Sequence, residues 1–437
     1  MTPAQFEQHL LRAFDALPAG AGSILVAYSG GMDSSVLLRA LAHMPQARAR
    51  GLRALHVDHG LHADSTAWSR HCAEFAAAQR VPFAALRVSV MRDSGTGLED
   101  AARTARQAAL GDAMTAGEIL ALAQHRDDQA ETILLKLLRG AGPEGLGGMR
   151  TMRQFAQGYL WRPLLDVPRA ALAAYAQTHA LRWIEDPSNA DTSLRRNFLR
   201  TEILPRLHQR WPDANAALAH SATWARHAAD FIDVHSARAL AELQGLDPAT
   251  LDWARWLALP DALRDPVLRL WLRGLDLDAP AHFHVEELER QLRGSARDRN
   301  PCVSWGDTEL RRYRDLLYAL HPAPAPPIDW ETPWQGEPIV LPGGGTLRLD
   351  HPAAEALPPS LRVRYRRGGE RLKPAGRQHT RELRLLLQEA GVPPWQRARV
   401  PLIFAADGEL LAAADLYASD TARALCARLG ARIVWQL

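Results

Sequence analysis

The stretch Ser29–Ser34, which reads Ser-Gly-Gly-Met-Asp-Ser, separates two segments of different character. Before it stands the short, apolar, β-prone run Ile24–Tyr28. After it, Ser35–Leu41 places apolar residues at helical spacing. The pattern therefore predicts a tight turn between a buried strand and a helix.

This turn has the chemistry of a phosphate-binding loop. Gly30 and Gly31 permit backbone conformations that other residues avoid, so the chain can approach a ligand closely. The first N–H groups of the following helix, from Met32 onward, have no partner within the helix, and the helix dipole favours an anion beside them. Ser29 and Ser34 add hydroxyl donors. We therefore expect all of Ser29–Ser34 to contact a phosphorylated ligand.

Asp33 distinguishes this loop from the G-x-x-x-x-G-K-[ST] loop, because no lysine follows the glycines. A carboxylate beside phosphates suggests a bridging Mg²⁺. The alternative is a Ser- and Gly-rich turn that only caps a core helix. The complete hexapeptide, placed between strand and helix, favours phosphate binding.

Composition is typical of a globular chain of two or three domains. The chain has 437 residues, of which 47% are hydrophobic and 23% charged. No apolar run is long enough for a membrane span and no signal peptide is recognisable, so we expect no membrane association. Three widely separated cysteines argue against disulfides or thiolate metal sites and favour a reducing, cytoplasmic location. The net charge of +3 comes with many arginines, which permits an RNA partner.

The predicted fold class is α/β, a doubly wound parallel sheet carrying the loop near its N-terminus, followed by an α-helical domain and a small α+β C-terminal domain. Apolar runs alternate with helical patterns over residues 20–125, which implies a parallel sheet covered by helices. Residues 214–320 are expected to be mostly helical, and the proline-rich segment after them to be a stiff linker. The expected domains are a catalytic domain at 1–213, a helical domain at 214–321, a linker at 322–335 and the C-terminal domain at 336–437.

Polar motifs follow the second and fourth predicted strands, where ligands of such sheets bind. His56 and Asp58 end the second strand and could reach a nucleotide on the first loop, although Asp-His-Gly is also ordinary turn chemistry. His125 follows the fourth strand, and Asp128 and Glu131 come next on a helix. Asp33, Asp128 and Glu131 are thus a predicted Mg²⁺ set, and either Asp127 or Asp128 is in place to cap the helix. The alternative is that these acids only stabilise the helix dipole.

The segment 140–149 is too glycine-rich for regular structure. It is either a lid over a substrate or a plain flexible connection.

Two basic regions are candidates for anion contacts. Arg195, Arg196 and Arg200 begin a helix and could hold phosphates or a carboxylate; a solvated basic face is the alternative. Further on, Arg362–Lys373 alternates arginines, among them Arg364 and Arg366, with Val and Tyr. Such a pattern suits RNA backbone contact and base stacking, or else a charged edge strand.

Together these motifs resemble the tRNA(Ile)-lysidine synthase family of the pyrophosphate-loop ATPases. The resemblance rests on Ser29–Ser34, His56–Leu61, Asp127–Met149, Arg162–Leu165 and Trp183–Asn197, and on a C-terminal likeness over Arg364–Trp395. Gln124, His62 and Gln107 depart from the family's usual residues, so we assign them no role.

The resemblance implies an ATP-dependent ligase that joins free L-lysine to the wobble cytidine of tRNA(Ile) with a CAU anticodon. An adenylated cytidine forms first, releasing pyrophosphate, and lysine then displaces AMP. The implied catalytic residues are Asp33, His125 and Arg196, with Ser29–Ser34, His56 and Asp58 binding ATP. Arg103, Arg106, Arg196 and Asn197 would contact lysine or tRNA, as would Arg364 and Arg366. ATP and Mg²⁺ are required, and no obligate protein partner is evident.

Other functions fit parts of the pattern. A tRNA thiolase would share the ATP chemistry, but it commonly carries sulfur on paired cysteines, which this chain lacks. Synthetases for GMP, NAD or asparagine share the loop, although no glutaminase domain fits here. A non-catalytic RNA-binding protein would have no need of Asp33, Asp128 and Glu131.

Overall fold

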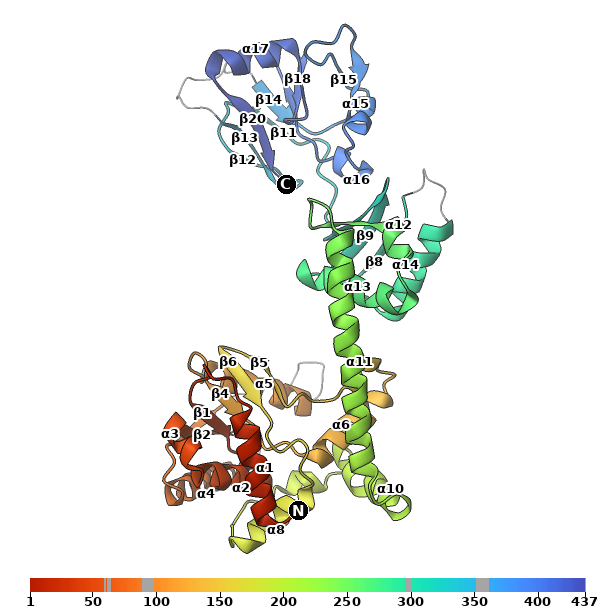
Figure 1. The fold of residues 1–437 in the computed structure, drawn as a ribbon. Coiled ribbons are helices and arrows are strands. Elements are labelled where there is room, and N and C mark those ends of the chain that lie inside the picture. The colour runs from red at the N-terminus through yellow and green to blue at the C-terminus, as the bar shows by residue number, and fades with distance from the viewer. Residues whose placement is uncertain (59, 61–63, 89–97, 295–299, 351–360, 437) are drawn as a thin grey trace. The chain divides into compact units, whose positions relative to one another are not determined.

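The computed structural model describes residues 1–58, 60, 64–88, 98–294, 300–350 and 361–436 (Figure 1). The chain divides into two compact units, Met1–Val234 and His235–Leu437. Their border falls inside α11 (Ala214–Leu243). The domain ranges expected from the sequence stay predictions.

The first unit is built on a six-stranded sheet with the order β3-β2-β1-β4-β6-β5. Five neighbouring strands run parallel and β5 is an antiparallel edge. The doubly wound α/β fold is therefore confirmed, with a hairpin, β5–β6, that the sequence did not predict. The strands are β1 (Ile24–Ala27), β2 (Leu52–Asp58), β3 (Phe83–Arg87), β4 (Ile119–Ala121), β5 (Met152–Phe155) and β6 (Gly158–Trp161).

Alternate residues of β1 enter two different cores, as expected for a sheet covered on both faces. Ile24 and Val26 pack with α1, α2 and α8, whereas Leu25 packs with residues of α5. The helices of this unit are α1 (Pro3–Asp15), α2 (Met32–Ala42), α3 (Pro45–Arg50), α4 (Ser65–Ala78), α5 (Leu98–Asp112), α6 (Arg126–Leu137), α7 (Pro143–Leu146), α8 (Arg169–Thr178), α9 (Arg195–Phe198), α10 (Leu204–Arg210) and the first part of α11; shorter turns cover Pro187–Ala190 and Leu199–Ile203.

The carboxyl ends of β1, β2 and β4 meet at one edge of the sheet because the strands are parallel. The chain leaves β1 into Ser29–Ser34, ends β2 at Asp58, and leaves β4 toward His125. This edge is where ligands bind in open α/β sheets.

The second unit begins with the end of α11 and with α12 (Trp253–Leu257), α13 (Asp261–Gly274) and α14 (His282–Gly294). It also contains an antiparallel sheet, order β7-β10-β9-β8, within a region expected to be mostly helical. Arg312 is buried at an inward position of β9, so the apolar alternation that marks a strand is broken there. The strands are β7 (Thr250–Asp252), β8 (Cys302–Trp305), β9 (Thr308–Tyr313) and β10 (Leu316–Leu320).

The C-terminal part is α+β, as predicted. Its larger sheet has the order β11-β14-β17-β18-β19, and smaller sheets pair β12-β13-β20 and β15-β16. Within the described ranges, we find no helix that has the length and apolar character of a membrane span. The elements are β11 (Glu331–Trp334), β12 (Ile339–Val340), β13 (Thr346–Asp350), β14 (Leu361–Arg364), β15 (Arg371–Leu372), β16 (Arg381–Glu382), α15 (Leu383–Glu389), α16 (Pro394–Arg397), β17 (Leu402–Phe404), β18 (Leu410–Ala413), β19 (Tyr417–Ala418), α17 (Asp420–Leu429) and β20 (Arg432–Gln436).

Candidate active site

The turn after β1 requires glycine at position 30. Gly30 has φ +85°, and a Cβ there would lie 2.7 Å from Cδ1 of Ile184 and 2.8 Å from Sγ of Cys72. The carbonyl of Gly30 accepts a hydrogen bond from the Ile184 N–H at 2.9 Å. The turn is thus held tightly against the segment around Ile184, and a larger residue at position 30 would push the turn away from that segment.

Hydroxyl groups line the turn at the start of α2. The Oγ atoms of Ser29 and Ser34 lie 3.1 Å apart, and Ser34 Oγ donates to the Gly31 carbonyl at 3.0 Å. Gly31 is the N-cap residue, and no side-chain hydrogen bond caps this helix. The Met32 side chain is buried in the core, so only its backbone is available to a ligand. The first-turn N–H groups of α2 are therefore not used by a capping side chain, which is compatible with the predicted phosphate contact.

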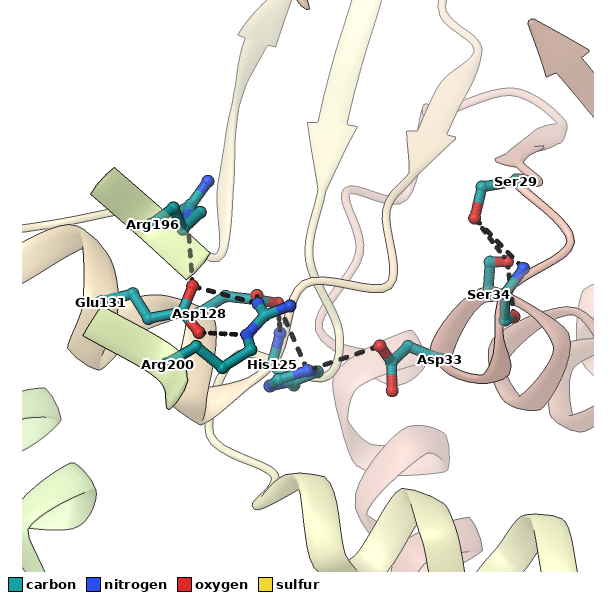
Figure 2. A network of polar contacts seen from close by, with 9 residues as sticks. Ser29, Asp33, Ser34, His125, Asp128, Glu131, Arg196 and Arg200 are labelled. Atoms are coloured by element: carbon teal, nitrogen blue, oxygen red, sulfur yellow. Dashed lines mark hydrogen bonds and ion pairs between the residues drawn. The ribbon is translucent and has the colours of Figure 1, made fainter. Parts of the chain in front are cut away.

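His125 lies between the acidic first turns of α2 and α6, and Figure 2 shows it between Asp33 and Asp128. Its Nε2 lies 3.5 Å from Oδ2 of Asp33 and 3.5 Å from Oδ2 of Asp128. Burial by itself would lower the pKa of this imidazole, but the hydrogen bond to Asp33 and the charges of Asp128, Asp33 and Asp127 outweigh it and raise the pKa. The arrangement favours a protonated histidine beside the phosphate loop.

Glu131 is fully buried and serves as the counter-ion of two arginines (Figure 2). Arg200 Nε donates to Glu131 Oε1 at 2.7 Å, and Arg196 Nε donates to Oε2 at 3.0 Å. Arg200 Nη2 also donates to Oδ1 of Asp128 at 3.1 Å. Burial raises the pKa of Glu131, while the hydrogen bond and charge of Arg200 act in the opposite direction.

These pairs bear on the predicted Mg²⁺ set. Among the described residues, no three His, Cys, Asp or Glu side chains form a group able to hold a metal ion. Both Glu131 oxygens face guanidinium groups, and Oδ2 of Asp128 accepts the His125 backbone N–H at 3.0 Å. Asp33 differs, because its Oδ1 is buried without a hydrogen-bond partner in the described part of the chain. Mg²⁺ commonly takes one or two carboxylates and completes its shell with water and phosphate, so Asp33 fits that role.

His56 and Asp58 occupy the predicted edge but are engaged within the protein. His56 is buried, with Nδ1 3.0 Å from the Tyr28 carbonyl and 3.7 Å from Sγ of Cys72. Asp58 Oδ1 accepts the Gly60 N–H at 2.8 Å, which is ordinary turn chemistry. Three further residues of this region, His59, Leu61 and His62, lie outside the described residues.

Asn197 and Arg196 have different surroundings although they are adjacent on α9. Asn197 is buried, and its Nδ2 donates to the carbonyls of Ser188 at 2.9 Å and Asp191 at 3.0 Å. It therefore holds the loop before α9. Arg196 extends toward α6, where its Nη2 donates to Oγ1 of Thr132 at 2.7 Å.

The remaining predicted RNA or lysine contacts lie on α5, on β14 and just after β14. Arg103 and Arg106 are exposed on α5. In the second unit, Arg364 Nη1 donates to Oε1 of Glu370 at 3.1 Å, and Arg366 Nε lies 3.9 Å from its Oε2. Tyr365, the aromatic residue of the Arg362–Lys373 pattern, is only 1% exposed, which argues against the base-stacking interpretation of that pattern.

The structure adds two residues that the sequence did not single out as site residues. Gln129 pairs with the Met149 backbone on both sides, accepting from its N–H at 2.8 Å and donating to its carbonyl at 3.0 Å. Arg226 of α11 donates to the carbonyls of Gly147 at 2.6 Å and Met149 at 2.8 Å. No spacing pattern could reveal Arg226, because its partners are about 80 residues away in the chain.

Family comparisons agree with this geometry. A family model described as a PP-loop domain matches residues 3–207, so the first unit belongs to the class of PP-loop ATP-binding domains. Two further models match downstream, the TilS substrate binding domain at 251–318 and the TilS substrate C-terminal domain at 361–435.

Curated relatives extend the match over nearly the whole chain. A protein of Xanthomonas axonopodis pv. citri is 47% identical over 95% of this chain and 94% of its own length. One of Xylella fastidiosa is 47% identical over 92% of both, and one of Pseudomonas aeruginosa is 43% identical over 97% of this chain and 96% of its own. Each is named tRNA(Ile)-lysidine synthase. The chain belongs to the tRNA(Ile)-lysidine synthase family.

Proposed function

We propose that this chain catalyses the ATP-dependent ligation of lysine to the wobble cytidine of tRNA(Ile) with a CAU anticodon. The observation that carries the proposal is the uncapped N-terminus of α2, whose first turn bears Asp33 next to His125, in a chain of this family. Cytosine O2 attacks the α-phosphate of ATP and pyrophosphate leaves. The lysine ε-amine then displaces AMP from C2 of the adenylated cytidine.

The phosphate loop binds the group that leaves in the first step. The first-turn N–H groups of α2 and the Ser29 hydroxyl would donate to pyrophosphate oxygens, and the Ser34 hydroxyl would join them by turning away from the Gly31 carbonyl. Asp33, through its unpaired Oδ1, would hold Mg²⁺, which when bound offsets charge on the phosphates. Asp128 and Glu131 act less directly, by positioning His125 and the arginines.

His125 supplies positive charge next to this loop. Its raised pKa keeps the imidazole protonated to higher pH than a free histidine. A cation at this place stabilises negative charge as it develops on the departing phosphate oxygens. It can also give up its proton, which makes it the candidate general acid.

The basic residues are proposed to hold the two other substrates. Arg196 is oriented by Glu131, and part of its side chain remains accessible, so it can contact an anion at the site. Arg103 and Arg106, exposed on α5, would contact RNA phosphate or the lysine carboxylate. Arg364 and Arg366 would contact the tRNA from the C-terminal domain, and the reaction would take place in the cytoplasm.

Product analysis tests the proposal. With ATP, Mg²⁺ and lysine, the full chain should release AMP and pyrophosphate only when tRNA(Ile) with a CAU anticodon is added. A transcript whose wobble cytidine is replaced by uridine is the matched control and should give no turnover. AMP release that is independent of RNA, or of lysine in multiple-turnover conditions, would contradict the assignment.

A further inference from the structure

The second unit contains a hollow of about 600 Å³ that has no part in the proposed chemistry. Its walls come from β9, from the proline-rich segment that follows β10, from the turn at Gly344 and Gly345, and from α16 with the residues after it. This volume lies within the range of roughly 300–1,000 Å³ that is typical of small-molecule pockets.

Trp395 is the aromatic residue of this wall. Its ring lies nearly perpendicular to those of Tyr318 and Tyr313, with centroid distances of 5.4 and 6.2 Å. The Arg311 guanidinium lies 5.4 Å from the Trp395 ring centroid. The indole Nε1 is buried, yet it has no hydrogen-bond partner among the described residues. A buried donor without a partner is costly, so an acceptor from a ligand would relieve it.

The charge around Trp395 is positive. Arg399 donates to the carbonyls of Gly343 at 2.6 Å and Pro324 at 2.8 Å, and it forms no ion pair with a carboxylate of the described residues. Arg397 likewise donates to the Val392 carbonyl and to the Tyr313 hydroxyl. Arg311 is the exception, because it is paired with Glu309. Two guanidinium charges are therefore left without a carboxylate beside an aromatic ring.

We propose that this hollow binds one nucleotide of a single-stranded RNA segment. The base stacks on the Trp395 ring, an oxygen of its ribose or phosphate accepts the indole N–H at the ring edge, and the phosphate lies near Arg399. Aromatic stacking combined with arginine–phosphate contact is how proteins bind unpaired nucleotides without a sequence code. The inference rests on the proposed function, in which RNA is the substrate, and it adds a second RNA contact remote from the phosphate loop in sequence.

Photocrosslinking of the full chain tests the site directly. A single-stranded RNA decamer containing 5-iodouridine is irradiated with the protein, and modified peptides are identified by mass spectrometry. Trp395 should carry the crosslink. Trp395→Phe should retain it at reduced yield, because the ring remains while the N–H is lost. Trp395→Ala should lower the yield on the peptide spanning residues 394–399 at least tenfold.

Controls separate this site from general RNA binding. Trp224→Ala removes an exposed tryptophan of the first unit and should leave the crosslink on Trp395 unchanged. An unlabelled single-stranded decamer, added before irradiation, should compete for the site and lower the crosslink yield. AMP or duplex RNA at the same concentration should leave the yield unchanged. If AMP alone lowers the crosslink yield, the hollow binds free nucleotides and the proposal is overturned. The absence of any crosslink on Trp395 would also overturn it.

Kinetics distinguish failure of this site from failure of the proposed function. Trp395→Ala should raise KM for tRNA severalfold and leave KM for ATP and kcat unchanged, because it removes an RNA contact that takes no part in the chemical steps. If this variant has the wild-type KM for tRNA, the hollow is not an RNA-binding site. That result would not affect the proposed ligase activity. If the wild-type chain forms no lysidine, the proposed function fails whatever Trp395 contacts.

Discussion

At the scale of single residues, the site depends on how buried charges are paired. The sequence predicted that Asp33, His125, Asp128 and Glu131 converge, because the motifs follow neighbouring strands of a parallel sheet. It could not predict which charges neutralise each other. Glu131 became a candidate metal ligand because it is a carboxylate at helical spacing from Asp128, whereas its two arginine partners come from positions more than 60 residues later.

The Asp33–His125 pair gives a pH prediction. Because its pKa is raised in the folded chain, the protonated His125 contributes stability that is fully present below the unfolded-state pKa. This contribution is lost as pH rises through the higher folded-state pKa. Asp33→Asn should lower the pKa of His125 in the folded chain, so that its contribution to stability is lost at lower pH. The same substitution should abolish AMP formation. NMR titration of the His125 imidazole measures the shift; an unchanged pKa would contradict the pairing.

The Glu131 cluster gives a stability prediction. Removing both partners in the double variant Arg196→Gln/Arg200→Gln leaves a buried carboxylate unpaired. The expected loss is about 2–4 kcal/mol, slightly below the value for fully buried pairs because both arginines are partly exposed. Urea unfolding measures it, and adding Glu131→Gln should restore much of the loss. Arg206→Gln, at an exposed pair with Glu202, is the control and should change stability by under about 1 kcal/mol.

At the scale of elements, the glycine-rich segment is held firmly at one end. Sequence left open whether 140–149 is a lid or a connection. The structure places the short helix α7 within it and anchors residues 147–150 through Gln129, Arg226 and Arg162, the last donating to the Arg150 carbonyl at 2.9 Å. Residues 140–142 are not anchored in this way by any described side chain. If segment 140–149 closes over a substrate, residues 140–142 would move and residues 147–150 would stay in place.

Arg226 tests this anchor. Arg226→Gln should remove the donors to Gly147 and Met149, loosen the segment, and lower kcat/KM for tRNA about tenfold or more, because positioning is lost. Steady-state kinetics at fixed ATP measures the effect. Arg150→Gln breaks only the exposed pair with Asp230 and serves as the matched control. Equal activity of Arg226→Gln and wild type would show that the anchor has no role in turnover.

Element prediction succeeded where periodicity is simple. The strands from β1 to β4 and the helices between them were predicted because apolar runs and turn residues alternate regularly. The sheet β7–β10 was missed, since Arg312 occupies an inward strand position and the surrounding arginines resemble a basic helix. The α+β character of the C-terminal part was also predicted, but the register in which its strands pair depends on long-range contacts that no local pattern carries.

At the scale of the whole molecule, the chain joins an ATP-binding unit to parts that would recognise RNA. Because three relatives match over more than 90% of their own length, they share this combination. The sequence could name the family from separate motifs, because each motif fixes a local chemistry. It could not locate the hollow beside Trp395, which is formed by segments from β9 to the residues after α16.

The C-terminal part gives a prediction about RNA affinity. Arg366 is the less tightly paired of the two arginines at Glu370. Arg366→Gln should weaken binding of tRNAs of different sequence by the same factor. It should also reduce the magnitude of the slope of log binding constant against log salt concentration by about 1, as expected for the loss of one phosphate contact. Filter binding across a salt series measures it. An unchanged slope would mean that Arg366 only balances the charge of Glu370.

The central claim is that this chain converts a wobble cytidine into lysidine. Nucleoside mass spectrometry of tRNA(Ile) with a CAU anticodon, after incubation with the protein, ATP, Mg²⁺ and isotopically labelled lysine, tests it most directly. We predict that the label appears on the wobble nucleoside with the wild-type chain and is absent with Asp33→Asn. An unmodified wobble cytidine with the folded, RNA-binding wild-type chain would contradict the account.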